Sequence, residues 1–185
     1  MPSPLPRRAA LALAALLHPA GAGASDPWDA LRAGGILLVR HAQAPGFGDP
    51  PGMRLGDCAT QRNLDEAGRA QARRIGEAVR AHGVVVGAVL ASQWCRTLET
   101  AELAFPGQVR AEPAFNSFFE DRGTAAAQTA AARAILLGWV GPGALVVSTH
   151  QVNITALSGI VPASGEGVVL RRESGALVLV GRVIA

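Results

Sequence analysis

The sequence predicts an α/β domain with a mostly parallel central sheet. Its 185 residues, 49% hydrophobic and only 17% charged, suit one compact domain with a substantial core. Short apolar runs of strand length alternate along the chain with longer segments of helical spacing, a pattern typical of α/β architecture. No repeat and no boundary to a second domain interrupts this alternation, so we expect a single domain over residues 25–185.

Each expected element follows from a local pattern. Apolar runs of strand length predict strands at 35–39, 84–90, 144–148, 168–172 and 176–183. Helical spacing predicts helices at 65–83, 94–104 and 125–140, and a short helix from residue 152. Asp65 is the expected N-cap of the first helix, and Gly83 is its expected stop. The stretch from Pro45 to Gly56 holds three prolines and four glycines, so we expect a loop there.

The first 24 residues have the pattern of an export signal peptide. Arg7 and Arg8 form a positive region, an apolar stretch follows at 9–17, and small residues at 22–24 form a cleavage site. We expect a mature chain from Ser25 in a bacterial periplasm or outside the cell. An anchoring helix is the alternative, but about nine apolar residues fall short of the ~20 that span a bilayer. No membrane association is expected after cleavage.

The charge balance of the mature chain indicates no polyanionic partner. All seventeen basic residues are arginines, and two of them fall in the export signal. The mature chain would carry fifteen arginines against fourteen acidic residues, a net charge of +1. That balance predicts neither a nucleic-acid partner nor a membrane-surface partner. The oligomeric state stays open.

The two cysteines, Cys58 and Cys95, lie 37 positions apart. An oxidising compartment would permit a disulfide between them, and closing a loop of that length would add roughly 3 to 4 kcal/mol to the free energy of unfolding. Two separate buried thiols are the alternative. A metal site that recruits His41 and His150 is a third interpretation, but these positions match no ligand spacing, so no metal is expected.

Polar residues follow the carboxyl ends of three expected strands. Arg40 and His41 follow the first strand, Ser92 and Arg96 follow the second, and His150 follows the strand at 144–148. Ligands of open α/β sheets bind at this edge. If the three strands are parallel neighbours, two arginines and two histidines converge there. Two planar guanidinium groups and an imidazole suit a phosphate dianion and can neutralise it without a metal.

Four motifs occur in a set order between about residues 35 and 160. They are Arg40-His41-Ala42 after a strand, Leu-Asp-Glu-Ala-Gly at 64–68, Ser-x-x-x-Arg-x-x-x-Thr-Ala at 92–101, and His150 after a late strand. This set resembles the motifs of the histidine phosphatase superfamily, where they read Arg-His-Gly, Leu-Thr-x-x-Gly, Ser-x-x-x-Arg-x-x-x-Thr-Ala and a second histidine. Ala42 departs from the usual glycine and adds a methyl group close to the expected phosphate.

The resemblance implies both a fold and a reaction. The fold would be the phosphoglycerate-mutase-like one, a three-layer α/β/α sandwich with helices flanking a mostly parallel sheet. His41 would attack phosphorus and become a phosphohistidine that water hydrolyses, while Arg40, Arg96 and His150 hold the phosphoryl oxygens. The protein would be a phosphomonoester hydrolase without a cofactor. Its substrate would be a phosphorylated small molecule or a phosphoprotein.

Cleavage of the ester calls for a general acid, because an alkoxide is a poor leaving group. Family members place a Glu or Asp either after the third strand or directly after the second histidine, where this chain has Gln151. Glu120 and Asp121 remain as candidates. We favour Glu120, because the phenylalanines at 118–119 would desolvate the carboxyl group and keep it protonated. A solvated loop in which both carboxylates pair with Arg122 is the alternative.

Two other functions fit the same motifs. A phosphotransferase or mutase would use the same phosphohistidine, but the expected export argues against it. The short segment after Glu120 also leaves no room for an inserted cap, so the site is expected to be open. A non-catalytic phosphate-binding module would be expected to lose one of the two arginines and two histidines, and all four are present. A Ser-His-Asp hydrolase is not predicted, because neither Ser92 nor Ser148 lies in a Gly-x-Ser-x-Gly context.

Overall fold

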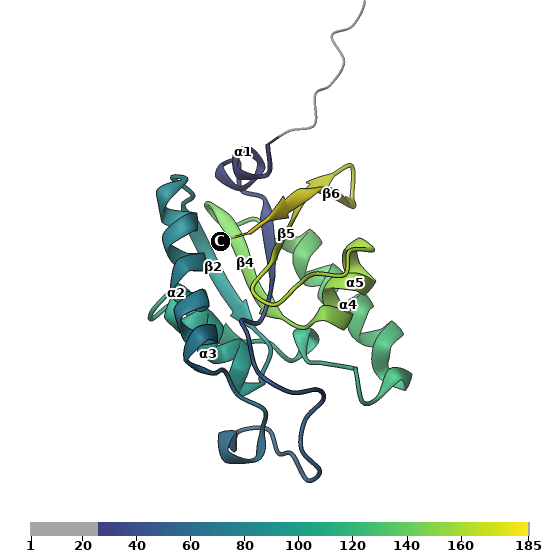
Figure 1. Cartoon of the computed structure of the whole chain (residues 1–185). Coiled ribbons are helices and arrows are strands. Elements are labelled where there is room, and N and C mark those ends of the chain that lie inside the picture. The colour runs from purple at the N-terminus through teal and green to yellow at the C-terminus, as the bar shows by residue number, and fades with distance from the viewer. Residues whose placement is uncertain (1–25, 185) are drawn as a thin grey trace, which may run out of the picture.

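The computed structural model describes residues 26–184, which form a six-stranded sheet with helices on both faces (Figure 1). The strands are β1 (Ile36–Arg40), β2 (Val86–Ala91), β3 (Val109–Ala111), β4 (Ala144–Thr149), β5 (Gly167–Glu173) and β6 (Ala176–Val183). The helices are α1 (Pro27–Arg32), α2 (Glu66–Ala81), α3 (Cys95–Ala104), α4 (Ala125–Gly138) and α5 (Gln151–Ser158). Between residues 26 and 184, no helix has the length and hydrophobicity needed to cross a membrane. The signal peptide predicted for residues 1–24 lies outside the described residues.

The sheet is parallel at its centre and antiparallel at one edge. Its strand order is β3-β2-β4-β1-β5-β6. Both β1 and β2 pair in parallel with β4, and β3 pairs in parallel with β2, whereas β5 and β6 run antiparallel. Arg40 lies beside Thr149 and Ala91 lies beside Ser148, so β1, β2 and β4 end at the same level. The prediction of a mostly parallel sheet is confirmed.

Alternate residues of the central strands supply two separate cores. Leu37 and Val39 of β1 pack in the core that contains residues of α2 and α3, whereas Ile36 and Leu38 pack in the core formed with α4 and α5. Figure 1 shows these two pairs of helices on opposite faces of the sheet. The three-layer α/β/α sandwich is therefore confirmed. Because both faces of β1 and β4 are buried, their sequences are continuous apolar runs.

The first turn of α2 packs closely against the segment that follows β1. The Asp65 side chain caps the helix by accepting a hydrogen bond from the Gly68 backbone at 2.7 Å. A Cβ atom at Gly68 would lie only 2.0 Å from the carbonyl oxygen of Gln43. Glycine at this position therefore allows α2 to contact the backbone two residues beyond His41.

Cys58 and Cys95 form the disulfide that the sequence suggested. It joins the short 3-10 turn Cys58–Thr60 to the first residue of α3. The backbone N–H of Cys95 also donates to the side-chain oxygen of Gln61 at 2.9 Å. The long loop between β1 and α2 is thus tied covalently to the helix that carries Arg96.

The sequence-based boundaries lie within about two residues of those observed, which is the usual uncertainty of helix and strand ends. Sequence analysis missed α1 and β3, which have six and three residues, because periodicity cannot be judged over so short a span. A local signal for α1 was nevertheless present. Asp26 accepts a hydrogen bond from the Trp28 backbone and Pro27 occupies the first helical turn, a combination that begins many helices.

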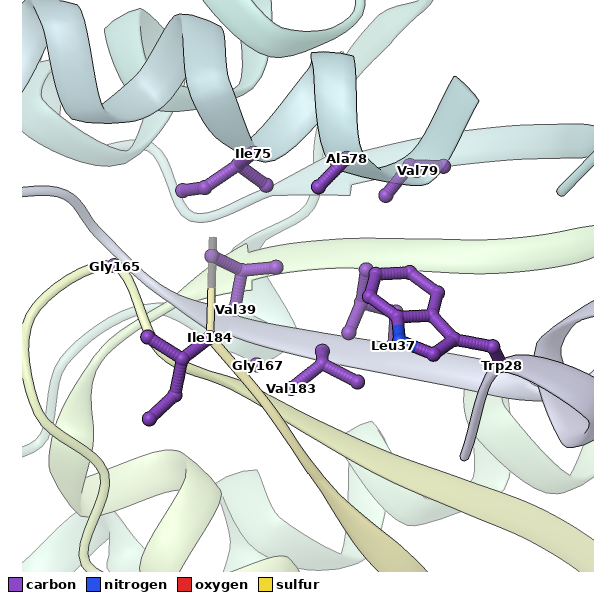
Figure 2. Close-up of a pocket in the computed structure, with 10 residues that line it drawn as sticks. All are labelled: Trp28, Leu37, Val39, Ile75, Ala78, Val79, Gly165, Gly167, Val183 and Ile184. Atoms are coloured by element: carbon purple, nitrogen blue, oxygen red, sulfur yellow. The ribbon is translucent and has the colours of Figure 1, made fainter. Parts of the chain in front are cut away.

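A small apolar hollow lies between α2 and the sheet. Figure 2 shows Ile75 and Val79 of α2 facing Leu37 and Val39 of β1, with the ring of Trp28 at one end. Its volume is about 10 Å³, roughly the room that one water molecule needs. Apolar walls offer such a water no partners, so this hollow is a packing crevice of the core.

Candidate active site

The carboxyl ends of β1, β2 and β4 open into one cavity of about 300 Å³. Backbone hydrogen bonds join the residues just past these ends, from His41 N to the Thr149 carbonyl at 2.9 Å and from Ser92 N to the Ser148 carbonyl at 3.0 Å. The residues that the sequence proposed for phosphate chemistry all line the cavity: Arg40, His41, Arg96, Glu120 and His150. The fold therefore brings together side chains from positions 40 to 150.

The cavity has a buried floor and an exposed rim. We define the floor as Arg40, His41, Arg96 and His150, of which the last three are only 3 to 4% exposed. We define the rim as residues 46–48 and 119–121, where Phe47 is 88% exposed. Strand ends and helix starts form the floor, whereas two loops form the rim.

His41 is held as a neutral imidazole with one nitrogen free to react. Its Nδ1 lies 2.8 Å from the carbonyl oxygen of Ala42, which can only accept, so Nδ1 carries the ring proton and Nε2 carries the lone pair. Burial, opposed by the hydrogen bond to Ala42 and assisted by the charges of Arg96, Arg62 and Arg40, lowers the pKa of His41 to about 3. A neutral imidazole is the form that can act as a nucleophile.

His150 faces His41 across the floor, with ring centroids 5.6 Å apart. Its Nε2 lies 2.8 Å from the hydroxyl of Ser92, the residue that begins the Ser-x-x-x-Arg motif. Burial lowers the pKa of His150 well below its ordinary value, and the neighbouring His41 and the arginines add to that effect. When the Ser92 hydroxyl donates to Nε2, the ring proton of His150 resides on Nδ1. The Nδ1–H group can then donate a hydrogen bond to an anion.

The two floor arginines each keep a buried donor without a partner. Arg40 donates through Nη1 to the Pro162 carbonyl at 2.9 Å, and Arg96 donates through Nη1 and Nη2 to Asp49. Within residues 26–184, the Nε atoms of both arginines are buried and make no hydrogen bond. Burial and the charge of Arg96 also lower the pKa of Arg40. Unsatisfied buried donors and neighbouring like charges both favour binding of an anion.

Two residues of the site, Asp49 and Arg62, were missed by sequence analysis. Arg62 lines the cavity, donates through Nε to the Gly48 carbonyl at 2.7 Å and also bonds the Ala44 carbonyl. Burial, followed by the charge of Arg96, lowers the pKa of Arg62. Both residues belong to an irregular loop, where no strand or helix pattern indicates which way a side chain points. The one available signal was that Arg62 stands two residues before the predicted motif at 64–68.

Part of this chain matches the model of a known protein family. Residues 36–118 match the family model of the histidine phosphatase superfamily, branch 1. That segment begins with β1 and includes Arg40, His41 and Arg96. The matched segment, which is less than half of the chain, shows the resemblance to this superfamily that the sequence motifs predicted. No curated protein matches the chain.

Solved structures share the fold at low sequence identity. The protein histidine phosphatase SixA complexed with tungstate aligns with a TM-score of 0.58 at 16% identity, over 81% of this chain and 96% of that one. Bacillus stearothermophilus YhfR aligns with 0.58 at 16%, over 80% and 95%. A phosphoserine phosphatase mutant from Entamoeba histolytica in complex with phosphoserine aligns with 0.56 at 15%, over 80% and 95%. Identities at this level show a common fold.

The chain's departure from the superfamily's Arg-His-Gly signature is accommodated by packing. Ala42 is fully buried, and its N–H donates to the hydroxyl of Thr100 at 3.0 Å. That hydroxyl donates in turn to the carbonyl of Arg96 at 2.6 Å. The threonine of the superfamily's Ser-x-x-x-Arg-x-x-x-Thr-Ala segment therefore links the segment after His41 to the helix turn that carries Arg96.

The structure separates the roles of the two candidate acids. Asp121 accepts a hydrogen bond from the Gly123 backbone at 3.0 Å and caps a short 3-10 turn, so its carboxylate has a structural partner. Both carboxylates line the cavity, but Glu120 receives no hydrogen bond from any residue between 26 and 184. Phe118 is buried in the protein while Glu120 is exposed, so the desolvation that the sequence suggested for this carboxyl is not seen. Over the same residues, no group of three or more His, Cys, Asp or Glu side chains is placed to hold a metal ion.

Proposed function

We propose that this protein is a metal-independent phosphomonoester hydrolase that acts through a phosphohistidine on His41. One observation carries the proposal. A neutral imidazole with its Nδ1 proton held by the Ala42 carbonyl lies in the same cavity as two arginines, the half-buried Arg40 and the buried Arg96. The Nε donors of both arginines are unsatisfied by any residue from 26 to 184. A phosphoryl group would satisfy both donors and accept the lone pair of the histidine.

The reaction would proceed in two displacements. His41 Nε2 attacks phosphorus, and the P–N bond forms as the P–O bond to the alcohol breaks. Glu120 donates a proton to the departing oxygen, so the alcohol leaves neutral. Water then attacks the phosphohistidine, Glu120 accepts its proton, and the P–N bond breaks to release inorganic phosphate and restore the neutral imidazole.

The floor supplies electrostatic stabilisation throughout both displacements. Arg40, Arg96 and His150 donate to the phosphoryl oxygens, and Arg62 adds positive charge from the wall of the cavity. Such prearranged donors stabilise the charge that develops in phosphoryl transfer. The tungstate complex of SixA supports this assignment, because tungstate is a tetrahedral oxyanion and SixA shares the fold.

The proposed substrate is a phosphorylated small molecule or a phosphoprotein that meets the enzyme outside the cytoplasm. The Cys58–Cys95 bond is compatible with an oxidising compartment. A bacterial periplasm or the extracellular space would fit the export signal expected from the sequence.

Hydrolysis of 4-nitrophenyl phosphate tests the proposal. The purified, oxidised protein is assayed across pH 4 to 8 in the presence of EDTA, beside His41→Ala. We expect turnover that EDTA leaves unchanged and that falls by a factor on the order of 10⁴ in the variant. Acid-labile ³²P incorporated by the wild type and absent from His41→Ala would locate the intermediate. Folded wild-type protein without turnover of any phosphomonoester, or full activity in His41→Ala, would refute it.

A further inference from the structure

We propose that the rim forms a subsite for an aromatic group on the alcohol side of the ester. The preferred substrates would be monophosphates of small alcohols that carry an aromatic ring and no second anionic group. This assignment rests on the phosphatase function proposed above and names its substrate class.

Aromatic side chains of the two rim loops meet at the mouth of the cavity. The ring of Phe47 contacts Phe119 edge to face, with centroids 5.1 Å apart and planes at 84°. The guanidinium of Arg122 lies over the Phe119 ring, 5.3 Å from its centroid. Edge-to-face pairs are a favourable aromatic geometry, and a further ring can extend them. The exposed face of Phe47 is open to such a ring.

The backbone holds Phe47 in this exposed position. Its neighbours Gly46 and Gly48 both have positive φ angles, 92° and 66°, which residues with side chains rarely adopt. The Gly48 carbonyl also accepts the hydrogen bond from Arg62, so the loop is fixed from inside the cavity. Phe47 and Phe119 together form an apolar patch at the mouth of the cavity, and contiguous patches of this kind mark ligand-binding grooves.

The size and charge of the cavity fit the same class of substrate. A phosphoryl group at the floor would occupy only part of the 300 Å³. The remaining lining includes apolar or aromatic side chains from four segments: Phe47, Met53, Trp94, Phe119 and Val152. The Asp121 carboxylate stands exposed beside them, so a second phosphate or carboxylate would meet like charge.

Two esters with leaving groups of similar basicity test the subsite. We compare kcat/KM for 2-phenylethyl phosphate and propyl phosphate in the wild type, in Phe47→Ala and in Leu55→Ala. Leu55 is a matched control because it is an exposed hydrophobic residue of the same loop that lies outside the cavity lining. We expect the wild type to prefer the phenylethyl ester by about tenfold, the factor that one aromatic contact gives. The ratio should fall to about one in Phe47→Ala and stay near ten in Leu55→Ala.

The outcomes separate the subsite from the phosphatase function. A wild-type ratio near one, with both esters hydrolysed in a His41-dependent manner, overturns the subsite and leaves the phosphatase function standing. An unchanged ratio in Phe47→Ala also overturns it. Hydrolysis of neither ester by folded protein would contradict both.

A different observation, the pairing of Asp49 with Arg96, carries a second inference. We infer that Asp49 is a positioning residue that fixes the orientation of Arg96 toward phosphate. Its two carboxylate oxygens accept from Arg96 Nη1 at 2.7 Å and Nη2 at 3.0 Å, and both side chains are buried. This pairing uses one edge of the guanidinium. On the other edge, Nε makes no hydrogen bond to any residue from 26 to 184, and we assign this edge to the phosphoryl group.

Asp49 itself is held from two further directions. Its oxygens also accept from the Arg62 backbone at 3.2 Å and from the indole N–H of Trp94 at 3.0 Å. Burial raises the pKa of Asp49, but the hydrogen bonds and charge of Arg96 outweigh burial and lower it overall. A carboxylate that stays ionised cannot be the general acid of the reaction.

A double-mutant cycle tests this role. Asp49→Asn should lower kcat/KM by about 10- to 100-fold, the range for a lost charge-assisted hydrogen bond. It should also weaken inhibition by inorganic phosphate by a similar factor. In an Arg96→Lys background the same change should cost less than about threefold, because its effect passes through Arg96.

Equal losses in both backgrounds would overturn the positioning role, because a general structural defect is independent of Arg96. Thermal melting of each variant reports folding. If Asp49→Asn does not fold, Asp49→Ser replaces it, since serine keeps an acceptor for the Arg62 backbone. A phosphate affinity that is unchanged in a folded Asp49 variant would also refute the role.

Discussion

The floor and the rim of the cavity are built by different means. Floor residues lie at strand ends or at the helix starts that follow them, and three of the four are buried. Backbone hydrogen bonds across the sheet set the spacing of these strand ends. Rim residues lie on two loops, are largely exposed, and meet through side-chain contacts such as the Phe47–Phe119 pair, while the disulfide ties the first of these loops to α3 at Cys58. Under the proposed function this difference is a division of labour, in which the sheet fixes the chemistry and the loops select the substrate.

Substitutions in the floor and in the rim test this division, because they should have different effects. A floor change should reduce turnover of every phosphomonoester. A change at the rim or its anchors should alter choice of substrate, dependence on the leaving group, or stability.

Arg96→Lys should have the largest effect. Lysine keeps the charge but loses the planar guanidinium that meets Asp49 with one edge and phosphate with the other. We expect kcat/KM to fall on the order of 10³-fold for all esters, the upper range for one transition-state donor. Arg73→Lys, on the exposed face of α2, is the matched control and should retain full activity. A similar loss in both variants, or none in Arg96→Lys, would contradict the floor assignment.

Glu120→Gln should have the second-largest effect on turnover, and its size should depend on the leaving group. We expect kcat for propyl phosphate to fall by about 10²-fold, because the alkoxide needs a proton. The loss for 4-nitrophenyl phosphate should be much smaller, because nitrophenolate leaves without one. Asp121→Asn is the paired control, since Asp121 caps a 3-10 turn. An equal loss on both substrates would remove Glu120 as the acid.

Replacing both cysteines with serine should affect stability more than catalysis. The bond closes a loop of 37 positions, so its loss should lower the free energy of unfolding by about 3 to 4 kcal/mol. Urea denaturation measures that change. We expect kcat/KM to fall about tenfold or less, because hydrogen bonds of the sheet hold the floor independently. A loss as large as that of Arg96→Lys would show that floor and rim are one unit.

A change of pH should have the smallest effect on turnover. Burial lowers the pKa of His41 to about 3, so we expect no ionisation of this residue in kcat/KM between pH 4 and 8. Stability should behave otherwise. The unfolded histidine, with a pKa near 6.5, binds a proton below that pH while the folded one does not, so stability present above pH 6.5 is lost as pH falls towards 3.

Urea denaturation at pH 7 and pH 5 measures this linkage. His41 alone should account for about 2 kcal/mol of lost stability, from about 1.4 kcal/mol per pH unit below 6.5. In His41→Asn, the decrease in the free energy of unfolding between pH 7 and pH 5 should be smaller by this amount. His82→Asn, at the exposed end of α2, is the control and should show the same decrease as the wild type. Identical acid sensitivity in wild type and His41→Asn would contradict a neutral buried imidazole.

Much of the fold and of the floor could be predicted from local patterns. The continuous apolar runs of β1, β2 and β4 indicated strands, of which β1 and β4 are buried on both faces, and Asp65 indicated the start of α2. Short elements such as β3 could not be predicted, because three residues carry no period. The assumption that Phe118 and Phe119 would shield Glu120 was wrong, since Phe118 turns into the protein while Glu120 stays exposed.

The sequence by itself determined the α/β class, the order of its elements and the four floor residues, because a strand has a fixed direction and its end places the next side chain at one edge of the sheet. Tertiary structure alone decided which groups surround them. Asp49 and Arg96 are 47 positions apart, and Arg62 reaches the cavity from a loop without periodicity. The hydrogen bonds that orient the two floor arginines and the contact between Phe47 and Phe119 depend on such long-range contacts, whereas the protonated nitrogen of His41 is set by its neighbour Ala42. Local pattern does not encode the long-range contacts, because they arise only when distant segments pack together.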